Sequence, residues 1–312
     1  MGRPLMTDTL KTVRVRVPCS TSNLGSGYDT IGLALNRYLE ATFEPGPTGL
    51  AISREGSLAA VSYDDGDDLV ALAFARTLRS MGREVGGTLR LTSDIPIGKG
   101  LGSSAAAILA GTDLALAASG QSRDDARVFE AAYEHEGHGD NAAPCLYGGL
   151  RAVLPGARGP LPIELELSPD LGFAYAAPAA ATETKVARGA LPERVGHDLA
   201  ARSLARATAL VRGLAGADKE LIKIGMEDEL HVPHRLPMIP GAYDAIAAGY
   251  EAGAWAVTIS GAGSGLIAIC DPSDAEGVAA AMLDVFCNGT DGLDCPAFAA
   301  KPDFTGLTRL SE

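Results

Sequence analysis

Alternating hydrophobic and polar positions open the chain. Val13, Val15 and Val17 alternate with polar residues, which is typical of a strand with one buried face. The pattern predicts further strands at residues 31–41, 88–92, 150–154, 162–167, 172–176, 255–259 and 266–270, and one in the C-terminal tail. Helical patterns cover residues 69–81, 103–118, 122–136, 183–190, 194–215, 240–251 and 275–286. Because these elements do not alternate regularly as in a doubly wound sheet, we predict an α+β fold.

The composition fits a chain with a sizeable, mainly aliphatic core. Of the 312 residues, 46% are hydrophobic but only 5% are aromatic. This length suggests two domains or one large domain. Proline and glycine cluster between residues 155 and 160, so we expect one domain at residues 11–165 and a second at residues 166–312.

The net charge of −13 argues against nucleic acid or an anionic membrane as the main partner. No run of about 20 apolar residues is present, and the first ten residues lack the apolar core of a signal peptide. The cysteines are scattered and form no Cys-x-x-Cys pair: Cys19, Cys145, Cys270, Cys287 and Cys295. Free thiols in a reducing compartment explain them best, so we expect a cytoplasmic protein.

A glycine-rich segment separates the predicted strand at residues 88–92 from the predicted helix at residues 103–118. Glycines at alternate positions leave backbone N–H groups accessible to an anion, and the dipole of the following helix adds to the attraction. The segment therefore predicts a phosphate loop. Its residues are Pro96, Ile97, Gly98, Lys99, Gly100, Leu101, Gly102, Ser103, Ser104, Ala105 and Ala106.

The spacing distinguishes this loop from commoner phosphate motifs. Walker A requires Gly-x4-Gly-Lys-Ser/Thr, but Lys99 is followed by Gly100. The dinucleotide fingerprint requires Gly-x-Gly-x-x-Gly, whereas the spacing here is Gly-x-Gly-x-Gly. Protein-kinase loops join two strands, whereas this one precedes an alanine-rich helix. A plain glycine-rich connection before a capped helix is the structural alternative.

Other polar residues supply the parts that a kinase of small alcohols needs. Ser104 and Glu130 offer the oxygen ligands that Mg²⁺ prefers. Lys99 can neutralise phosphate charge, and Arg188 and Arg235 can bind a substrate carboxylate. Phosphoryl transfer depends largely on positioning and charge stabilisation, so a strong protein base is not required.

Each of these groups also has a structural interpretation. Glu130 can be a solvated helix residue beside other glutamates, and Arg188 can cover a helix C-terminus. Turn formation or helix capping is the alternative role for Asn23, Asp29, Asp140 and Asn141. Residues 260–265 can form a hairpin loop without a ligand.

Two His-x-x-His pairs raise a metal alternative. His135 and His138 form the first pair, and His231 and His234 form the second. A zincin site needs histidines four residues apart on one helical face. Here the spacing is three, and glycine or proline interrupts each helix, so a zinc site is disfavoured.

Four segments together resemble the GHMP small-molecule kinases: residues 15–32, 96–106, 130–144 and 260–264. They span most of the chain. Three shorter stretches resemble the homoserine kinases within that family. These are Asn-Leu-Gly at residues 23–25, His-x-Asp-Asn at residues 138–141, and Thr-Lys-x-x-Arg-x-x-Leu-Pro at residues 184–192.

The resemblance implies ATP-dependent phosphorylation of the hydroxyl of L-homoserine, a step of threonine biosynthesis. It also implies Mg²⁺, a homodimer, and a two-domain fold with a ribosomal-S5-like N-terminal domain and a ferredoxin-like C-terminal domain. Two alternatives stay open: another GHMP kinase that acts on a different small carboxylate-bearing alcohol, and a non-catalytic ATP-sensing protein.

Roles follow from the resemblance position by position. The phosphate loop is expected to bind ATP, and Ser104 and Glu130 are expected to bind Mg²⁺. Catalytic roles fall to Asn141, which would hold the reacting hydroxyl, and to Lys99 and Arg235. Asp29 would meet the substrate ammonium, and Arg188 and Arg235 its carboxylate. The expected substrate shell comprises Asn23, Asp29, Asp140, Asn141, Thr184, Arg188 and Arg235.

The chain departs from the usual family residues within these motifs. Tyr28 stands where Phe is usual, Ser26 where Pro is usual, and Asp68 where an Asn near the adenine is frequent. Gly139 and the pair Ser264 and Gly265 also replace positions that usually contain proline. None of these departures removes an expected metal or substrate ligand.

Overall fold

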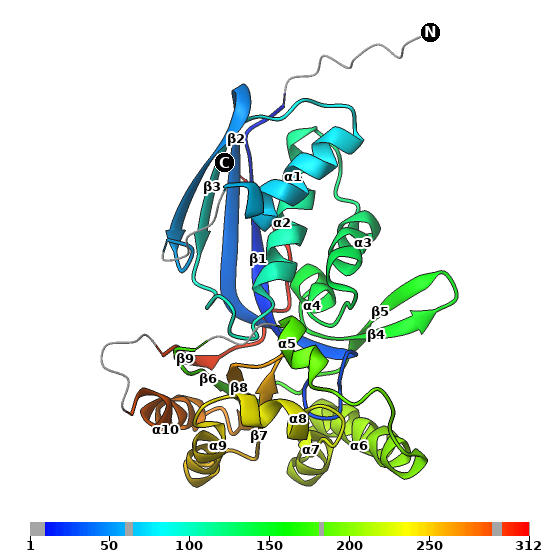
Figure 1. The fold of residues 1–312 in the computed structure, drawn as a ribbon, viewed down its shortest axis with the longest axis vertical. Coiled ribbons are helices and arrows are strands. Elements are labelled where there is room, and N and C mark those ends of the chain that lie inside the picture. The colour runs from blue at the N-terminus through cyan, green and yellow to red at the C-terminus, as the bar shows by residue number, and fades with distance from the viewer. Residues whose placement is uncertain (1–9, 60–64, 181–183, 289–294, 312) are drawn as a thin grey trace.

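A computed structural model of the chain describes residues 10–59, 65–180, 184–288 and 295–311. It has an upper part with one sheet and a lower part with a second sheet (Figure 1). Helices and largely antiparallel strands mix in both parts, in agreement with the predicted α+β class. None of the helices in the described residues combines the length and apolar character that a membrane crossing requires.

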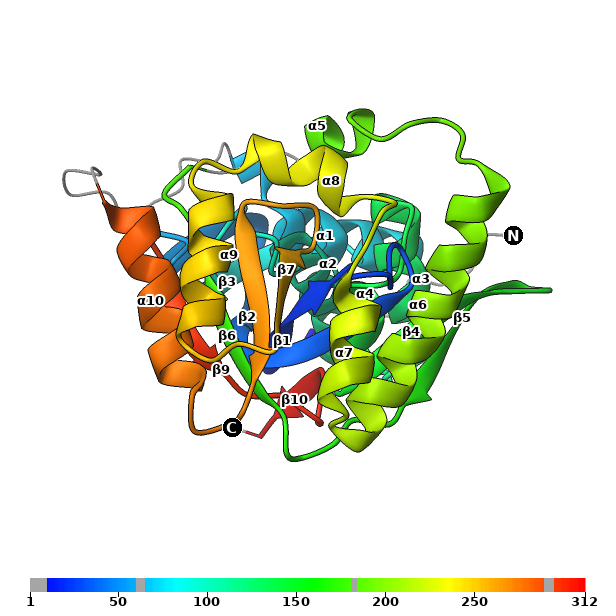
Figure 2. The ribbon, with the colours of Figure 1, turned by 90° about the horizontal axis from the view of Figure 1, so that it is seen from below.

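The first sheet joins strands from both ends of the chain. Its order is β10–β1–β2–β4–β5, and β3 pairs with β2. The strands are β1 (Val13–Ser22), β2 (Ile31–Gly56), β3 (Gly86–Ser93), β4 (Leu150–Gly156), β5 (Gly159–Leu165) and β10 (Thr308–Leu310). The β4–β5 hairpin projects away from the rest of the molecule (Figures 1 and 2).

Helices on one side of this sheet complete the core of the upper part (Figure 1). They are α1 (Leu69–Ser80), α2 (Ser103–Ala118), α3 (Asp125–Glu136) and α4 (Ala142–Tyr147). Helix α2 is buried on nearly all sides from Ala105 to Ala118, which agrees with its small and apolar residues. The phosphate loop therefore leads into a helix that the core holds rigidly.

The second sheet has the order β7–β8–β6–β9 and pairs antiparallel throughout. Its strands are β6 (Gly172–Ala176), β7 (Ala256–Ser260), β8 (Gly265–Cys270) and β9 (Ala297–Ala300). Two pairs of helices lie beside it in Figure 2. One pair is α9 (Ala242–Glu251) with α10 (Ala275–Cys287), and the other is α6 (His197–Gly216) with α7 (Lys219–Met226).

Two short helices lie at the junction of the parts. These are α5 (Thr184–Gly189) and α8 (Val232–Arg235). Elsewhere, 3₁₀ turns cover Asp65–Asp67, before α1, and Leu236–Met238, after α8. Figure 1 draws α5 between the upper helices and the lower sheet. Both α5 and α8 carry an arginine that the sequence assigns to the substrate shell.

The C-terminal tail returns to the first sheet. Strand β10 pairs with β1, with Leu310 opposite Arg14. Arg309 also makes two hydrogen bonds, of 2.6 and 2.9 Å, to the fully buried carboxylate of Asp113 on α2. The predicted division into domains at residues 11–165 and 166–312 stays a prediction. The C-terminal tail lies beyond residue 166 but pairs with the first sheet.

The predicted elements differ from the observed ones mainly in length and number. Strand β2 extends to Gly56, whereas the pattern predicted its end near residue 41. Its two arms both pair with β3, with Leu39 opposite Ser93 and Leu50 opposite Gly87. Helices α7 and α8 were not predicted, because each spans fewer than three turns and carries too few periodic positions to be recognised.

Candidate active site

Backbone geometry at the phosphate loop requires glycine. Gly98, Gly100 and Gly102 adopt φ angles of 68°, 74° and 63°, in the left-handed region that L side chains rarely adopt. Space is also short, since a Cβ on Gly100 would lie 2.0 Å from the carbonyl oxygen of Ser260. The alternating spacing seen in the sequence therefore reflects both conformation and close approach of a second backbone.

Successive carbonyl groups of this loop accept hydrogen bonds from other segments. Ser264 Oγ donates to the carbonyl of Gly98 (3.2 Å), and Ser260 Oγ donates to that of Gly100 (2.7 Å). The Tyr175 hydroxyl donates to the carbonyl of Lys99, and the Ser20 N–H donates to that of Leu101 (3.2 Å). Three of the four donors come from the second sheet and its β7–β8 turn. The lower part therefore fixes the loop.

This arrangement determines where the loop N–H groups point. In a trans peptide the N–H of one residue points away from the carbonyl of the residue before it. Since the carbonyls of residues 98–101 face their donors, the N–H groups of residues 99–102 face the opposite way. Helix α2 begins at Ser103, and its N-cap residue, Gly102, provides no side-chain hydrogen bond. Its first N–H groups are therefore available to an anion.

Ser104 contacts a carboxylate, but not the one expected. Its Oγ hydrogen-bonds Glu136 at the end of α3, and the Glu136 side chain is only 10% exposed. Glu130 is exposed in a groove beside α1, together with Arg76. The structure therefore brings Glu136 rather than Glu130 to Ser104, and a metal role for Glu130 stays a prediction. Six residues along a helix rotate a side chain by about 240°, so Glu130 and Glu136 face different directions.

Lys99 does not point into the site. Its ammonium hydrogen-bonds the carbonyl oxygens of Pro178 (2.8 Å), Ala179 (2.5 Å) and Ala180 (2.9 Å), and the residue is buried. An ammonium has three donors, and these carbonyls accept all three. In this structure Lys99 therefore anchors the segment that precedes α5.

Two charged groups assigned to the substrate shell pair with each other. Arg188 on α5 donates two hydrogen bonds to the Asp29 carboxylate, of 2.6 and 3.0 Å. Asn23 orders the same turn, because its Oδ1 accepts from the Asp29 N–H (2.7 Å) and its Nδ2 donates to the carbonyl of Gly261 (2.9 Å). Asp29 and Arg188 are each about one-third exposed, so a ligand can reach both.

Asp140 and Asn141 lie directly before α4, and the Asn141 side chain is close to Gly102 of the phosphate loop. Ser20 Oγ donates to Asn141 Oδ1 (3.0 Å), which leaves the amide NH₂ for another partner. His138 Nδ1 donates to Asp140 Oδ1 (2.5 Å), and the second oxygen of this fully buried carboxylate has no partner in the described residues. Burial alone would lower the pKa of His138. The nearby carboxylates of Asp140 and Glu136 have the opposite and larger effect, so the pKa of His138 is raised.

Arg235 is the largest fully buried side chain in the described residues. Its Nε donates to the carbonyl of Ala187 (3.3 Å), and its Nη1 has no partner there. The guanidinium lies over the Tyr28 ring, 5.2 Å from the centroid, and the other side of Tyr28 stacks on His231. Burial lowers the pKa of His231, which therefore adds no positive charge beside Arg235 at neutral pH.

One cavity of about 400 Å³ connects most of these groups. From the expected site it includes Asn23, Gly98, Gly100, Leu101, Gly102, Ser103, Ser104, Asn141, Arg188 and Arg235. Asp29 and Asp140 adjoin it through their partners Arg188 and His138. Thr184 begins α5, the helix that brings Arg188 to the cavity. Pro96, Ile97, Ala105 and Ala106 do not line this cavity.

Four titratable residues in this cavity were not assigned to the site from the sequence: His135, Glu136, His138 and Lys185. Glu136 and His138 flank Gly137, directly before Asp140, so their proximity in sequence was an available signal. Lys185 lies three residues before Arg188, a spacing that puts both side chains on one face of α5.

The geometry does not support either His-x-x-His pair as a metal site. In the described part of the chain, the group whose possible ligand atoms all lie within 4.8 Å is Asp29, His138 and Asp140. Arg188 already binds the Asp29 carboxylate within this group. This guanidinium neutralises one of the two carboxylates and repels a divalent ion, so the group is a poor zinc site.

A smaller cavity of about 110 Å³ lies against the phosphate loop and α2. Its walls are mainly apolar and include Leu39, Leu69 and Leu91. Asp68 also borders it, but both carboxylate oxygens are engaged, one by the N–H of Ala71 (3.0 Å) and one by Arg54 (2.9 Å). Asp68 therefore acts as the N-cap of α1 in this structure.

Comparison with known proteins agrees with this arrangement. Residues 68–149 match the family model described as the GHMP kinases N terminal domain, and residues 208–286 match GHMP kinases C terminal. A homoserine kinase of a Synechococcus species is 38% identical over 87% of this chain and 90% of that protein. A homoserine kinase of Moorella thermoacetica is also 38% identical, over 82% of this chain and 86% of that protein.

The chain belongs to the homoserine kinases of the GHMP family. The crystal structure of a homoserine kinase from Cytophaga hutchinsonii superimposes with a TM-score of 0.84 at 28% identity and covers 99% of this chain and all of that one. A mevalonate kinase structure from L. major superimposes at 0.69 with 14% identity, over 98% and 99% of the two chains, and shows the shared fold alone. The predicted two-domain GHMP kinase fold is confirmed.

Proposed function

We propose that this member of the homoserine kinases transfers the γ-phosphoryl group of ATP to the hydroxyl of L-homoserine, giving O-phospho-L-homoserine and ADP for threonine biosynthesis. The observation that carries the proposal is the single cavity of about 400 Å³. Phosphate-loop residues and Ser104 line it together with Asn141, Arg188 and Arg235. A phosphate donor and a small acidic acceptor can therefore meet inside it.

The nucleotide end follows from the backbone. The open N–H groups of the loop and of α2 suit the phosphates, because they are fixed and point the same way. The smaller apolar cavity beside α1 suits the base. For Mg²⁺, the hydroxyl of Ser104 and the carboxylate of Glu136 form a hard oxygen pair that fits the ion. When bound, Mg²⁺ supplies charge neutralisation at the phosphates.

The acceptor end provides one group for each part of an amino-acid alcohol. The unpartnered Nη1 of Arg235 suits the carboxylate, with Arg188 beside it. The open oxygen of Asp140, together with Asp29, suits the ammonium. The free NH₂ of Asn141 orients the hydroxyl oxygen toward the phosphate loop. Asn141 and Arg235 thus keep their expected roles as proposals, and Lys99 takes a positioning role instead.

A direct assay tests the reaction. The purified protein with Mg-ATP and L-homoserine should release ADP in proportion to a new phosphomonoester signal in ³¹P NMR. ADP release that does not depend on homoserine would contradict the proposal. Two analogues test the acceptor groups: 4-hydroxybutyrate lacks the ammonium, and 3-aminopropan-1-ol lacks the carboxylate. Each should lose at least about 100-fold in kcat/KM, because a buried charged partner is left unpaired.

A different carboxylate-bearing alcohol is the competing acceptor, and the acidic pair favours homoserine over it. Asp29 and Asp140 have little function beside an acceptor without an ammonium. If mevalonate or shikimate gave a higher kcat/KM than homoserine, the acceptor assignment would be wrong while the kinase assignment stood. The homodimer and the cytoplasmic location are further proposals that rest on the resemblance and on cysteines that are scattered along the sequence without a Cys-x-x-Cys pair. Light scattering of the purified protein tests the first.

A further inference from the structure

Lys99, the cationic residue within the phosphate loop, already has hydrogen-bond partners for its ammonium group. Lys99 donates all three ammonium hydrogens to the carbonyls of Pro178, Ala179 and Ala180. Turning it toward a phosphate would break these bonds and leave the buried carbonyl of Pro178 unpaired. A different side chain is therefore needed if a protein cation is to contact the phosphoryl group that is transferred.

Two of the remaining cations on the cavity wall serve other partners. Arg188 binds Asp29 through both oxygens. Arg235 is 1% exposed and is held over the Tyr28 ring and against the carbonyl of Ala187. Both guanidinium groups are thus held against the turn that carries Tyr28 and Asp29.

Lys185 remains, and its position fits the task. It is exposed, it lines the same cavity as Gly98 to Ser104, and the described residues show no hydrogen bond or ion pair of its ammonium. It shares a face of α5 with Arg188, three residues later, while Val186 is 53% exposed. The helix thus presents two cations, Lys185 and Arg188, to the cavity that the phosphate loop also lines.

We propose that Lys185 contacts the transferred phosphoryl group and that Lys99 is a positioning residue that holds the segment before α5. The inference rests on the proposed function. The bond from the acceptor oxygen to the γ-phosphorus forms while the bond to the β–γ bridging oxygen breaks. The bridging oxygen leaves with the electron pair as part of ADP, and the hydroxyl proton is released to water. Lys185 stabilises the charge on the phosphoryl oxygens throughout.

Nucleotide binding tests this assignment without the acceptor. Isothermal titration with Mg²⁺ compares the β,γ-imido analogue of ATP with ADP. We expect Lys185→Met to weaken binding of the analogue about tenfold while ADP changes by less than about twofold, since only the analogue carries the contacted group. In the assay, kcat should fall about 100-fold. Lys185→Arg should recover part of both losses.

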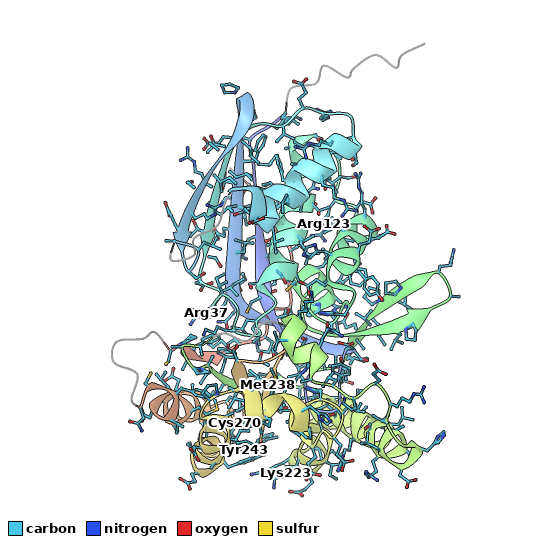
Figure 3. The ribbon with its side chains drawn as sticks, in the orientation of Figure 1. Arg37, Arg123, Lys223, Met238, Tyr243 and Cys270 are labelled. Atoms are coloured by element: carbon cyan, nitrogen blue, oxygen red, sulfur yellow. The ribbon has the colours of Figure 1, made fainter. Side chains whose placement is uncertain are left out.

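Lys223→Met is the matched control for removal of an exposed lysine. Figure 3 labels Lys223 at the lower edge of the molecule on α7, where it pairs with Glu220. It should bind both nucleotides as the native protein does. If Lys185→Met did the same, the inference would be overturned. Loss of analogue binding in Lys99→Met but not in Lys185→Met would reverse the two roles. A native protein that binds nucleotide but never phosphorylates homoserine would instead refute the proposed function.

Discussion

At the scale of single residues, the proposed Mg²⁺ site depends on the carboxylate of Glu136. Glu136 contacts Ser104 in the cavity, whereas Glu130 is exposed on another face of α3. We expect Glu136→Gln to lower kcat/KM by about 100-fold and to raise the Mg²⁺ concentration needed for half-maximal rate, because a charged metal ligand is lost. Initial rates over a Mg²⁺ series measure both. Glu130→Gln is the control and should stay within about twofold.

The same pair explains which part of the site the sequence could not predict. Spacing along the chain predicted a carboxylate on the helix after the phosphate-loop helix, and the structure has one there. Which glutamate faces Ser104 depends on the rotation of α3 about its axis and on where Gly137 ends it. Glu130, Glu134 and Glu136 are the same type of residue on one helix. Only the packing of that helix determines which of them faces Ser104.

Tyr28 joins the charged groups at the acceptor end. Its hydroxyl accepts a hydrogen bond from Arg188 (3.3 Å), and its ring lies under Arg235. Burial, with Asp29 beside it, raises the pKa of Tyr28, so the hydroxyl stays protonated. We expect Tyr28→Phe to raise KM for homoserine about three- to tenfold with kcat nearly unchanged, because Arg188 loses one partner but keeps Asp29.

Steady-state kinetics of the matched variant Tyr243→Phe provide the control. Figure 3 labels Tyr243 on α9, in the lower part of the molecule, and its side chain is exposed. It should leave both constants within about twofold of the native values. A fall in kcat with an unchanged KM for Tyr28→Phe would contradict the positioning role.

At the scale of elements, Lys99 links the phosphate loop to the strand end that leads into α5. Lys99→Met leaves carbonyls of residues 178–180 without their donor, so we expect the free energy of unfolding to fall by about 1–3 kcal/mol. KM for homoserine should also rise, because Arg188 depends on α5. Urea denaturation and steady-state rates measure the two effects. An unchanged denaturation midpoint would show that the anchor has no energetic role.

Elements with a strong local pattern were predicted well. The small, apolar residues from Ser103 to Ala118 predicted α2 at its observed bounds, because so long a run of such residues is typical of a helix that is buried on all sides. The second arm of β2 was missed, because Pro45 and Pro47 interrupt the alternation where the strand bends. That arm is fixed by pairing with β3, a long-range contact that local periodicity does not contain.

At the scale of the molecule, the site exists because two parts of the chain meet. The upper part supplies the phosphate loop, Ser104 and Asn141, and the lower part supplies α5, α8 and the β7–β8 turn. Thr21 and Ser260 join them through buried hydroxyls 2.9 Å apart. The sequence predicted which segments carry chemistry. Their meeting in one cavity depended on tertiary packing and was supported in advance only by the family resemblance.

The C-terminal tail contributes to stability through a buried ion pair with α2. Arg309 binds Asp113 through two hydrogen bonds, and a third bond reaches the carbonyl of Gln121 (2.7 Å). Asp113 is 0% exposed, so Arg309→Leu leaves a buried carboxylate without a counter-charge. We expect a loss of roughly 3 kcal/mol. For a chain of this length the corresponding fall in Tm is about 5 °C.

Calorimetry of three variants separates this effect from loss of any arginine. Arg90→Leu removes one partner of the exposed pair with Glu44 and should change stability by less than about 1 kcal/mol. Asp113→Asn combined with Arg309→Leu should recover part of the loss, because the uncompensated charge is gone. If Arg309→Leu lowered Tm no more than Arg90→Leu, the tail would not stabilise the helix that carries the phosphate loop. In that case bound nucleotide would raise Tm by the same amount in both variants, because neither substitution would disturb the phosphate loop through α2.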